Sequence, residues 1–349
     1  KHLSDTYYNI MNYKIRKISE INKGLLNDFF KAAYPDRYNN LVNYWRWYYR
    51  LNYSNFEPIV IEVNSEIIGM AGLISSKLKF NNKVSDAIWF TDFFILKEFR
   101  NKGYGSILTK EWMKICPIQI TFCNNESLKI FKKFSWQSNN DTYRNIKPIN
   151  FVKIIPLIKN FSFTLNRNLQ KFILATNNNY NKTIKPKQIE NNDISELCNL
   201  ENKKESNKDL FSIVHDEEWF KWRLIDSPYK SNIYIFRNNS DVIVGNIFKH
   251  NNLKRFNILY SYINNPDDKE IYDLIINWSI ENKIDYVWYI NNQENIFFRE
   301  TKLISKFFKK KINFACWSED RAILSNLKKG LSNSHGFDSD IDSILFKDQ

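Results

Sequence analysis

A short glycine-containing loop carries the residues best suited to hold an anion. The segment 100–106 (RNKGYGS) places two of the chain's eight glycines within three positions, directly before a run with helical spacing. A helix N-terminus presents unpaired backbone N–H groups and the positive end of the helix dipole, and glycine lets the backbone approach phosphate oxygens closely. Arg100 and Lys102 add positive charge. The loop therefore predicts a pyrophosphate site, although it is neither a Walker loop nor a complete GxGxxG fingerprint.

The elements around this loop predict an α/β unit. The apolar run 87–96 (AIWFTDFFIL) has the length of a buried strand, and the residues after the loop (SILTKEWMKI) place apolar side chains on one helical face. A further strand at 117–123 and a further helix (NESLKIFKKF) follow. Upstream, residues 58–75 read as a β-hairpin closed by a short polar turn. This order predicts strand, anion loop, helix, strand and helix.

Composition narrows the class of protein. With 43% hydrophobic and 16% aromatic residues, the 349-residue chain can form a packed core. It has no apolar run long enough for a membrane span and no signal-peptide pattern at its first residues, so we expect a cytoplasmic protein. The net charge of +13 is dispersed, which favours a phosphate-bearing ligand over nucleic acid. The oligomeric state stays open between monomer and homodimer.

The four cysteines, Cys116, Cys123, Cys198 and Cys316, are scattered and have no neighbouring histidine cluster. Metal ligation and a disulfide framework both need closer spacing, so we expect free, packed thiols and no metal site.

The second part of the chain echoes the first. A tryptophan-rich helix, a strand, a polar turn and a hydrophobic strand with glycine occur in both, with 22 positions from Trp47 to Gly69 and 23 from Trp222 to Gly245. Such an echo predicts a duplicated fold, although two unrelated α/β segments can share the pattern. We expect domains at 1–150 and 193–349, joined by a helix and linker at 151–192. The second copy has no glycine pair at the equivalent loop, so it is expected to be a scaffold.

Two motifs resemble signatures of the GCN5-related N-acetyltransferase (GNAT) superfamily. Arg100-x-x-Gly103-x-Gly105 is similar to its coenzyme A signature, and the segment 124–136 (NNESLKIFKKFSW) is similar to its second signature. The resemblance implies two tandem GNAT-like domains of α/β class, each a mixed, mostly antiparallel sheet flanked by helices. It implies acyl-CoA as cosubstrate, with direct attack by an amine on the thioester. The implied coenzyme-binding residues are Phe94, Ile95, Arg100, Asn101, Lys102, Gly103, Tyr104, Gly105, Ser106, Asn124, Ser127 and Phe131.

The resemblance also suggests catalytic roles. Backbone N–H groups around Phe94 to Leu96, with Ile95 at their centre, are expected to hold the thioester oxygen. Asp92 is our preferred general base, and Glu62 and Asp86 are weaker alternatives. In the other interpretation, Asp92 only caps a turn. Phe131 stands where the family often has the tyrosine that protonates the leaving thiolate, so that acid is absent here. Tyr104 or Tyr143 could replace it.

The tandem arrangement resembles acyltransferases that modify nucleotide-linked amino sugars for bacterial surface polysaccharide. We therefore expect such a sugar to bind between the halves. The residues expected to contact it are Trp47, Trp222, Arg223, His250 and Asp338; His335 is a further possible base. Alternatively, the tryptophans are core residues, which is the more common role of aromatic side chains at helical spacing. Alternatives for the acceptor are a protein, peptide or polyamine amine, or an aminoacyl-tRNA-dependent (FemABX-like) reaction, which would not need the glycine loop.

Overall fold

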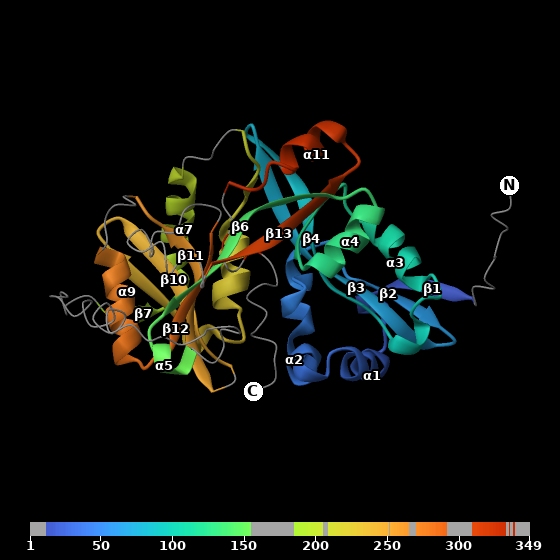
Figure 1. Cartoon of the computed structure of the whole chain (residues 1–349), viewed down its shortest axis with the longest axis horizontal. Coiled ribbons are helices and arrows are strands. Elements are labelled where there is room, and N and C mark those ends of the chain that lie inside the picture. Colours follow the sequence, from blue (N-terminus) through green and yellow to red (C-terminus); the bar gives the residue numbers. More distant parts are fainter. Residues whose placement is uncertain are drawn as a thin grey trace, which may run out of the picture.

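The computed structural model describes residues 12–154, 185–204, 209–250, 252–264, 270–291 and 309–332, together with His335 and Asp338. These residues form one large mixed sheet with helices on both faces (Figure 1). The sheet order is β1-β2-β3-β4-β5-β13-β6-β12-β11-β10-β9-β7, and β8 pairs with β3 outside this path. The predicted α/β class with tandem GNAT-like sheets is confirmed.

We call the elements up to β6 the first half and the elements from β7 onward the second half. The first half contains β1 (Tyr13–Lys17), α1 (Lys23–Ala33), α2 (Tyr38–Tyr48), β2 (Ile59–Val63), β3 (Glu66–Phe80), β4 (Lys83–Ile95), α3 (Tyr104–Met113), β5 (Ile118–Cys123), α4 (Asn125–Lys133) and β6 (Gln137–Pro148). The predicted hairpin is β2–β3, and its turn residues Asn64 and Ser65 have positive φ angles.

The second half follows the short α5 (Phe151–Ile154). It contains β7 (Lys187–Gln188), α7 (Asn191–Lys203), β8 (Ser212–Ile213), α8 (Glu217–Phe220), β9 (Ile233–Asn238), β10 (Asp241–His250), β11 (Leu253–Tyr262), α9 (Glu270–Glu281), β12 (Tyr286–Asn291), β13 (Lys309–Ser318) and α11 (Arg321–Leu327). Most of the expected linker, residues 155–184, lies outside the described part of the chain.

The two halves of the sheet are arranged alike. From one edge, the order is β1, β2, β3, β4 and β5, and the equivalent strands from the other edge are β7, β9, β10, β11 and β12, as a duplicated fold requires. In each half, three antiparallel pairings lead to a parallel pairing, β4 with β5 and β11 with β12. Both long hairpins also contain a register shift, one near Gly72 and one at Gly245. A Cβ at Gly245 would lie 2.5 Å from the Asn257 carbonyl oxygen, so glycine is needed there. Duplication explains these matching irregularities.

The two halves exchange their last strands. The final strand of the first half, β6, pairs with β12 of the second half, and β13 pairs with β5 of the first half. The two exchanged strands also pair with each other, and they run side by side through the middle of the molecule (Figure 1). The expected boundary at residue 150 therefore does not separate two sheets.

Alternating side chains of the strands face two helical layers. On one face, Met70 and Ile74 pack in the cluster that includes Leu41 and Tyr48 of α2. On the other face, Leu73 packs with α3 and α4. Period-two alternation along β3 explains this division.

Among the described residues, no helix is long and apolar enough to cross a bilayer.

Candidate active site

The site predicted from the glycine loop lies where β4 and β5 separate. The two strands pair in parallel at Ile88↔Gln119 and Trp89↔Ile120. β4 then continues to Ile95 without a partner on that side, and Asp92 has a φ angle of 48° in a β-bulge opposite β3. A bulge bends its strand and increases the local twist. The backbones of β4 and β5 therefore separate toward their carboxyl ends, and we call the space between these two strand ends the gap.

The backbone of Ile95 points into this gap. The N–H of the next residue, Leu96, donates to the Ile68 carbonyl oxygen of β3 at 2.8 Å. Successive N–H groups of a strand point to opposite sides, so the Ile95 N–H points away from β3 and toward the gap. The predicted oxyanion donor therefore has the required orientation, whereas Leu96, the other end of the expected range, is engaged with β3.

Arg100 fixes the end of β4. Its Nε donates to the Ile95 carbonyl oxygen at 2.9 Å, and its guanidinium lies 5.0 Å from the centre of the Phe94 ring. The carbonyl and the N–H of one residue leave a strand on the same side, so this contact also supports the orientation of Ile95. Arg100 thus couples the glycine loop to the gap.

The loop has the backbone that an anion site requires. Gly103 has a φ angle of 86°, and a Cβ there would meet nothing within 4 Å. A Cβ at Gly105 would be 3.8 Å from its nearest neighbours, Ile95 and Phe93, so packing does not require glycine at this position. Among the described contacts, the N–H groups of residues 101–105 donate no hydrogen bond. Open space beside free donors at the start of α3 fits a pyrophosphate.

The second signature forms a helix cap and part of the core. The Asn124 side chain accepts a hydrogen bond from the Ser127 N–H at 2.8 Å and so caps α4. Phe131 is buried between Phe90 and Trp136, with ring centroids 5.2 and 4.6 Å away. Asn124, Ser127 and Phe131 thus start α4 and pack it against the core, and their contact with coenzyme A stays a prediction.

The structure gives Asp92 a partner that sequence reasoning missed. Its carboxylate pairs with Arg37 at 2.6 Å and also accepts a hydrogen bond from the Tyr49 hydroxyl at 2.9 Å. Burial alone would lower the Arg37 pKa, but the Asp92 carboxylate outweighs it and holds that pKa above its usual range. A general base needs a free oxygen facing the ammonium, and both oxygens of Asp92 are engaged. The geometry thus favours a structural ion pair.

The alternative carboxylates lie elsewhere. Asp86 is nine residues from Ile95 on the same strand, about 30 Å away at strand rise. Glu62 is on β2 and pairs with Arg16 at 3.1 Å. Of the two candidate acids, Tyr104 is buried at the start of α3, and Tyr143 lies in β6 with the Lys311 ammonium 5.7 Å from its ring centre.

The tryptophans expected to stack on substrate form the contact between the halves. Trp222 is fully buried. The Trp47 indole N–H donates to the Trp222 carbonyl oxygen at 2.8 Å, and the Trp222 indole N–H donates to the Trp47 carbonyl oxygen at 2.6 Å. The Arg223 guanidinium is buried 4.6 Å from the Trp222 ring centre. Burial leaves Trp222 and Arg223 no face for a sugar or base. His250 ends β10, and its side chain lies outside the described part of the chain.

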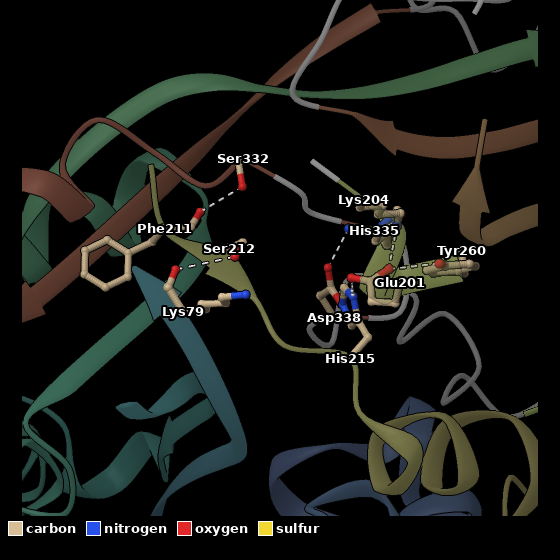
Figure 2. A network of polar contacts seen from close by, with 10 residues as sticks. All are labelled: Lys79, Glu201, Lys204, Phe211, Ser212, His215, Tyr260, Ser332, His335 and Asp338. Atoms are coloured by element: carbon tan, nitrogen blue, oxygen red, sulfur yellow. Dashed lines mark hydrogen bonds and ion pairs between the residues drawn. The ribbon is translucent and has the colours of Figure 1, made fainter. Parts of the chain in front are cut away.

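Asp338 belongs to a buried polar network that the sequence did not reveal (Figure 2). It accepts from His215 Nε2 at 2.6 Å, while His215 Nδ1 contacts Glu201 at 2.7 Å. The N–H of Val214, next to His215, donates to the carbonyl of Lys77 in β3. Lys77 is seven residues along β3 from Met70, which pairs with Phe94 at the end of β4. At strand rise this is about 23 Å from the gap. Asp338 is therefore not placed to meet an acceptor there.

Three ligand atoms of this network, from Glu201, His215 and His335, lie within 4.8 Å of one another, as a metal site would need. However, the Lys204 ammonium lies among them, 2.7 Å from Glu201 and 3.1 Å from His335 Nε2. A lysine cation thus takes the place that a metal ion would occupy.

The cysteines have no nucleophilic setting. All four are free. Burial raises the pKa of Cys116 to about 11 and the pKa values of Cys123 and Cys316 to about 12, and burial also raises the Cys198 pKa. Thiols of this kind stay protonated at neutral pH.

The separated strands, the Ile95 N–H and the glycine loop have the features that an acyl-CoA-dependent transferase site requires. Residues 21–136 match the family model described as acetyltransferase (GNAT) family. This part of the chain is thus similar to GNAT acetyltransferases, and the protein is an N-acyltransferase that uses an acyl-CoA donor. A comparison with curated proteins gave no match.

Solved structures support the tandem fold. The chain is similar to Saccharomyces cerevisiae N-myristoyltransferase with bound myristoyl-CoA, with a TM-score of 0.57 and 15% identity over 87% of this chain and 82% of that chain. It is also similar to a GCN5-related N-acetyltransferase from Kribbella flavida, with a TM-score of 0.53 and 9% identity over 87% of this chain and 71% of that one. At these identities the likeness is one of fold.

Proposed function

We propose that this protein transfers an acyl group from acyl-CoA to the primary amine of a nucleotide-linked amino sugar. The donor half of this proposal rests on one observation above all: the Ile95 N–H points into the gap beside a glycine loop with free N–H groups. Donor and acceptor then meet at the end of β4.

The chain's own residues account for the main steps. The loop and the α3 N-terminus bind the pyrophosphate, Arg100 holds the end of β4, and the Ile95 N–H stabilises the negative charge that develops on the thioester oxygen when the amine attacks. Removing one such donor typically costs about 3 kcal/mol of transition-state stabilisation. The amine nitrogen bonds to the thioester carbon to give a tetrahedral intermediate, which then breaks its carbon–sulfur bond. Coenzyme A leaves as the thiolate and is protonated as the nitrogen loses its proton, so no acyl-enzyme is needed. This agrees with cysteines whose pKa values are raised.

The second half has lost the donor function. Its helix α9, equivalent to α3, begins with Glu270, which accepts a hydrogen bond from Asn238 at 3.0 Å. A carboxylate at a helix N-terminus takes the position at which α3 is free to hold phosphate. The second half is therefore proposed to bind the acceptor.

A second candidate acceptor is the amine of a peptide. It is favoured by the fold likeness to an N-myristoyltransferase, which covers both halves. Acidic surfaces would favour a basic peptide or polyamine, whereas this chain carries a net charge of +13. We therefore place the amino sugar first.

The test is thiol release from acetyl-CoA and longer acyl-CoA thioesters with nucleotide-linked 3-amino and 4-amino sugars and with N-terminal glycine peptides. Gly103→Glu serves as the blocked control, because a carboxylate in the loop repels pyrophosphate. Release with a sugar that is lost in the control supports the proposal. Release with peptides alone assigns the acceptor to the second candidate, and a failure to bind coenzyme A contradicts the site itself.

A further inference from the structure

The far wall of the gap comes from the exchanged strands. β5 ends at Cys123, where it still pairs with Asn313 of β13. β13 begins four residues earlier and runs antiparallel to β5, so its first residues extend past β5 at the edge where β4 ends. The parallel pairing of β4 with β5 places Ile95 level with this extension. The gap thus has β4 on one side and the start of β13, backed by β6, on the other.

This wall carries two cations that face each other. Arg144 of β6 is the direct cross-strand partner of Lys310 of β13. Opposite residues of an antiparallel pair lie about 5 Å apart on one face, and like charges there destabilise the sheet. Arg144 is half-buried, and among the described residues no carboxylate lies within ion-pair distance of either side chain. Burial lowers the Arg144 pKa, as expected for a guanidinium without an acidic partner.

The pair lies on the face of the sheet that carries α2. Lys310 is an even number of residues from Phe314 and Cys316, which pack in the same cluster as α2, whereas Ala315 packs with α3. Phe94 of β4 also packs against the α2 cluster. Arg144 and Lys310 therefore share a face with Phe94, across the gap from the end of β4.

We propose that Arg144 and Lys310 form the subsite for the diphosphate of the acceptor. This inference rests on the proposed function and specifies its acceptor. A guanidinium offers paired donors in the geometry of phosphate oxygens, and an ammonium adds a point charge. Two cations on directly opposite residues suit a group with more than one negative charge, such as a diphosphate, better than a single carboxylate. The donor's pyrophosphate has its own loop at α3, on the opposite side of the gap.

The experiment measures binding of UDP, as a nucleoside diphosphate probe, to the full chain saturated with coenzyme A. The variants are Arg144→Gln and Lys310→Gln, which keep a polar side chain and remove one charge each. Lys329→Gln is the matched control, because it removes an exposed lysine after α11, beyond the other end of β13. Calorimetry gives both affinities, and melting temperatures show that the variants fold.

We expect Arg144→Gln to weaken UDP binding by about tenfold or more, since charge-assisted hydrogen bonds contribute about 1.5–3 kcal/mol. Lys310→Gln weakens it less, and coenzyme A affinity stays unchanged in both. No UDP binding to the wild-type protein, or equal binding by Arg144→Gln, overturns the subsite. An equal loss of coenzyme A affinity assigns the cations to the donor and overturns it as well.

Failure of the proposed function looks different. If the wild-type protein does not bind coenzyme A, the donor site is wrong, whatever UDP does. If coenzyme A binds and acyl transfer to a nucleotide-linked amino sugar is intact in Arg144→Gln and Lys310→Gln, the proposed function stands and the diphosphate subsite alone is overturned.

Discussion

Trp47 and Trp222 hold each other by reciprocal hydrogen bonds, each indole N–H donating to the backbone carbonyl of the other residue, 175 positions away. Their ring centroids are 6.2 Å apart. The residues are equivalent in the duplicated pattern, so this contact lies on the approximate two-fold axis that relates the halves. We expect Trp222→Phe to lower the free energy of unfolding by about 1–3 kcal/mol, because a carbonyl loses its donor in a buried contact.

Urea unfolding of Trp47→Phe, Trp222→Phe and the double variant checks this prediction. Residues in contact show coupling, so the double variant should lose a different amount than the sum of the single ones. Additive losses would contradict a reciprocal contact.

Substitutions at the two glycines of the loop should have different effects, one on folding stability and the other on coenzyme A binding. Gly103→Ala forces a side chain into the left-handed region and should cost about 1–2 kcal/mol of folding free energy. Gly105→Leu should leave stability near that of wild type, because a Cβ there would make only ordinary contacts at 3.8 Å, but it should abolish coenzyme A binding by covering the N–H groups of α3. Thermal melting and calorimetry distinguish the two. Unimpaired coenzyme A binding by Gly105→Leu would show that phosphate does not approach this position.

Asp92→Asn should act mainly on folding. It leaves the Arg37 guanidinium in place with its charge no longer compensated, which typically costs about 3–5 kcal/mol for a buried pair. Urea unfolding measures the loss, and Arg37→Met/Asp92→Leu should recover much of it. If Asp92 is instead the general base, Asp92→Asn protein that remains folded will lose the acidic limb of the pH–rate profile.

The network around His215 should make stability depend on pH in both directions. Burial alone would lower the His215 pKa, but Asp338 and Glu201 outweigh it and raise this pKa to about 9. The folded pKa exceeds the unfolded value of about 6.5, so this stabilisation is complete below about pH 6.5 and is lost as the pH rises toward 9. The loss should be about 3 kcal/mol.

His335 acts in the opposite sense. Burial, Lys204 and His215 together hold its pKa well below the usual value, so its contribution is lost as the pH falls below about 6.5. Denaturant midpoints from pH 5 to 10 check both effects. Stability should peak near neutrality, and His215→Gln should flatten the alkaline side; a flat profile in the wild-type protein would contradict the network.

Acyl transfer should survive thiol modification. Because burial raises the pKa values of all four cysteines, iodoacetamide at pH 7.5 should react slowly and leave thiol release from acyl-CoA unchanged. Rapid inactivation that acyl-CoA prevents would point to a cysteine nucleophile and against direct attack by the amine.

Much of the donor site could be predicted from the sequence because its signals are local. The apolar run at 87–96 became β4 (Lys83–Ile95), and the run at 117–123 became β5 (Ile118–Cys123). Glycine spacing before a helix has a direct physical meaning, and Gly103 has the positive φ that it suggested. The echo around Trp47 and Trp222 also corresponds to equivalent elements of the two halves.

The remaining features depend on contacts between distant residues. Arg37 and Asp92 are 55 positions apart, and His215 and Asp338 are 123 positions apart, so neither pair has a sequence pattern. Helical spacing could not show that Trp222 faces the other half rather than a ligand. Alternation along a strand indicates which face is buried but not which strand is the neighbour, and for this reason the exchange of β6 and β13 could not be predicted.

The exchange of β6 and β13 also determines how late in translation the sheet can be completed. The strand that covers β5 starts at Lys309, so the edge of β5 stays unpaired until most of the chain has left the ribosome. Unpaired edges are templates for association with other chains. A premature stop before β13 would thus release a first half with an open edge, and this nascent chain would depend on chaperones throughout translation of the second half.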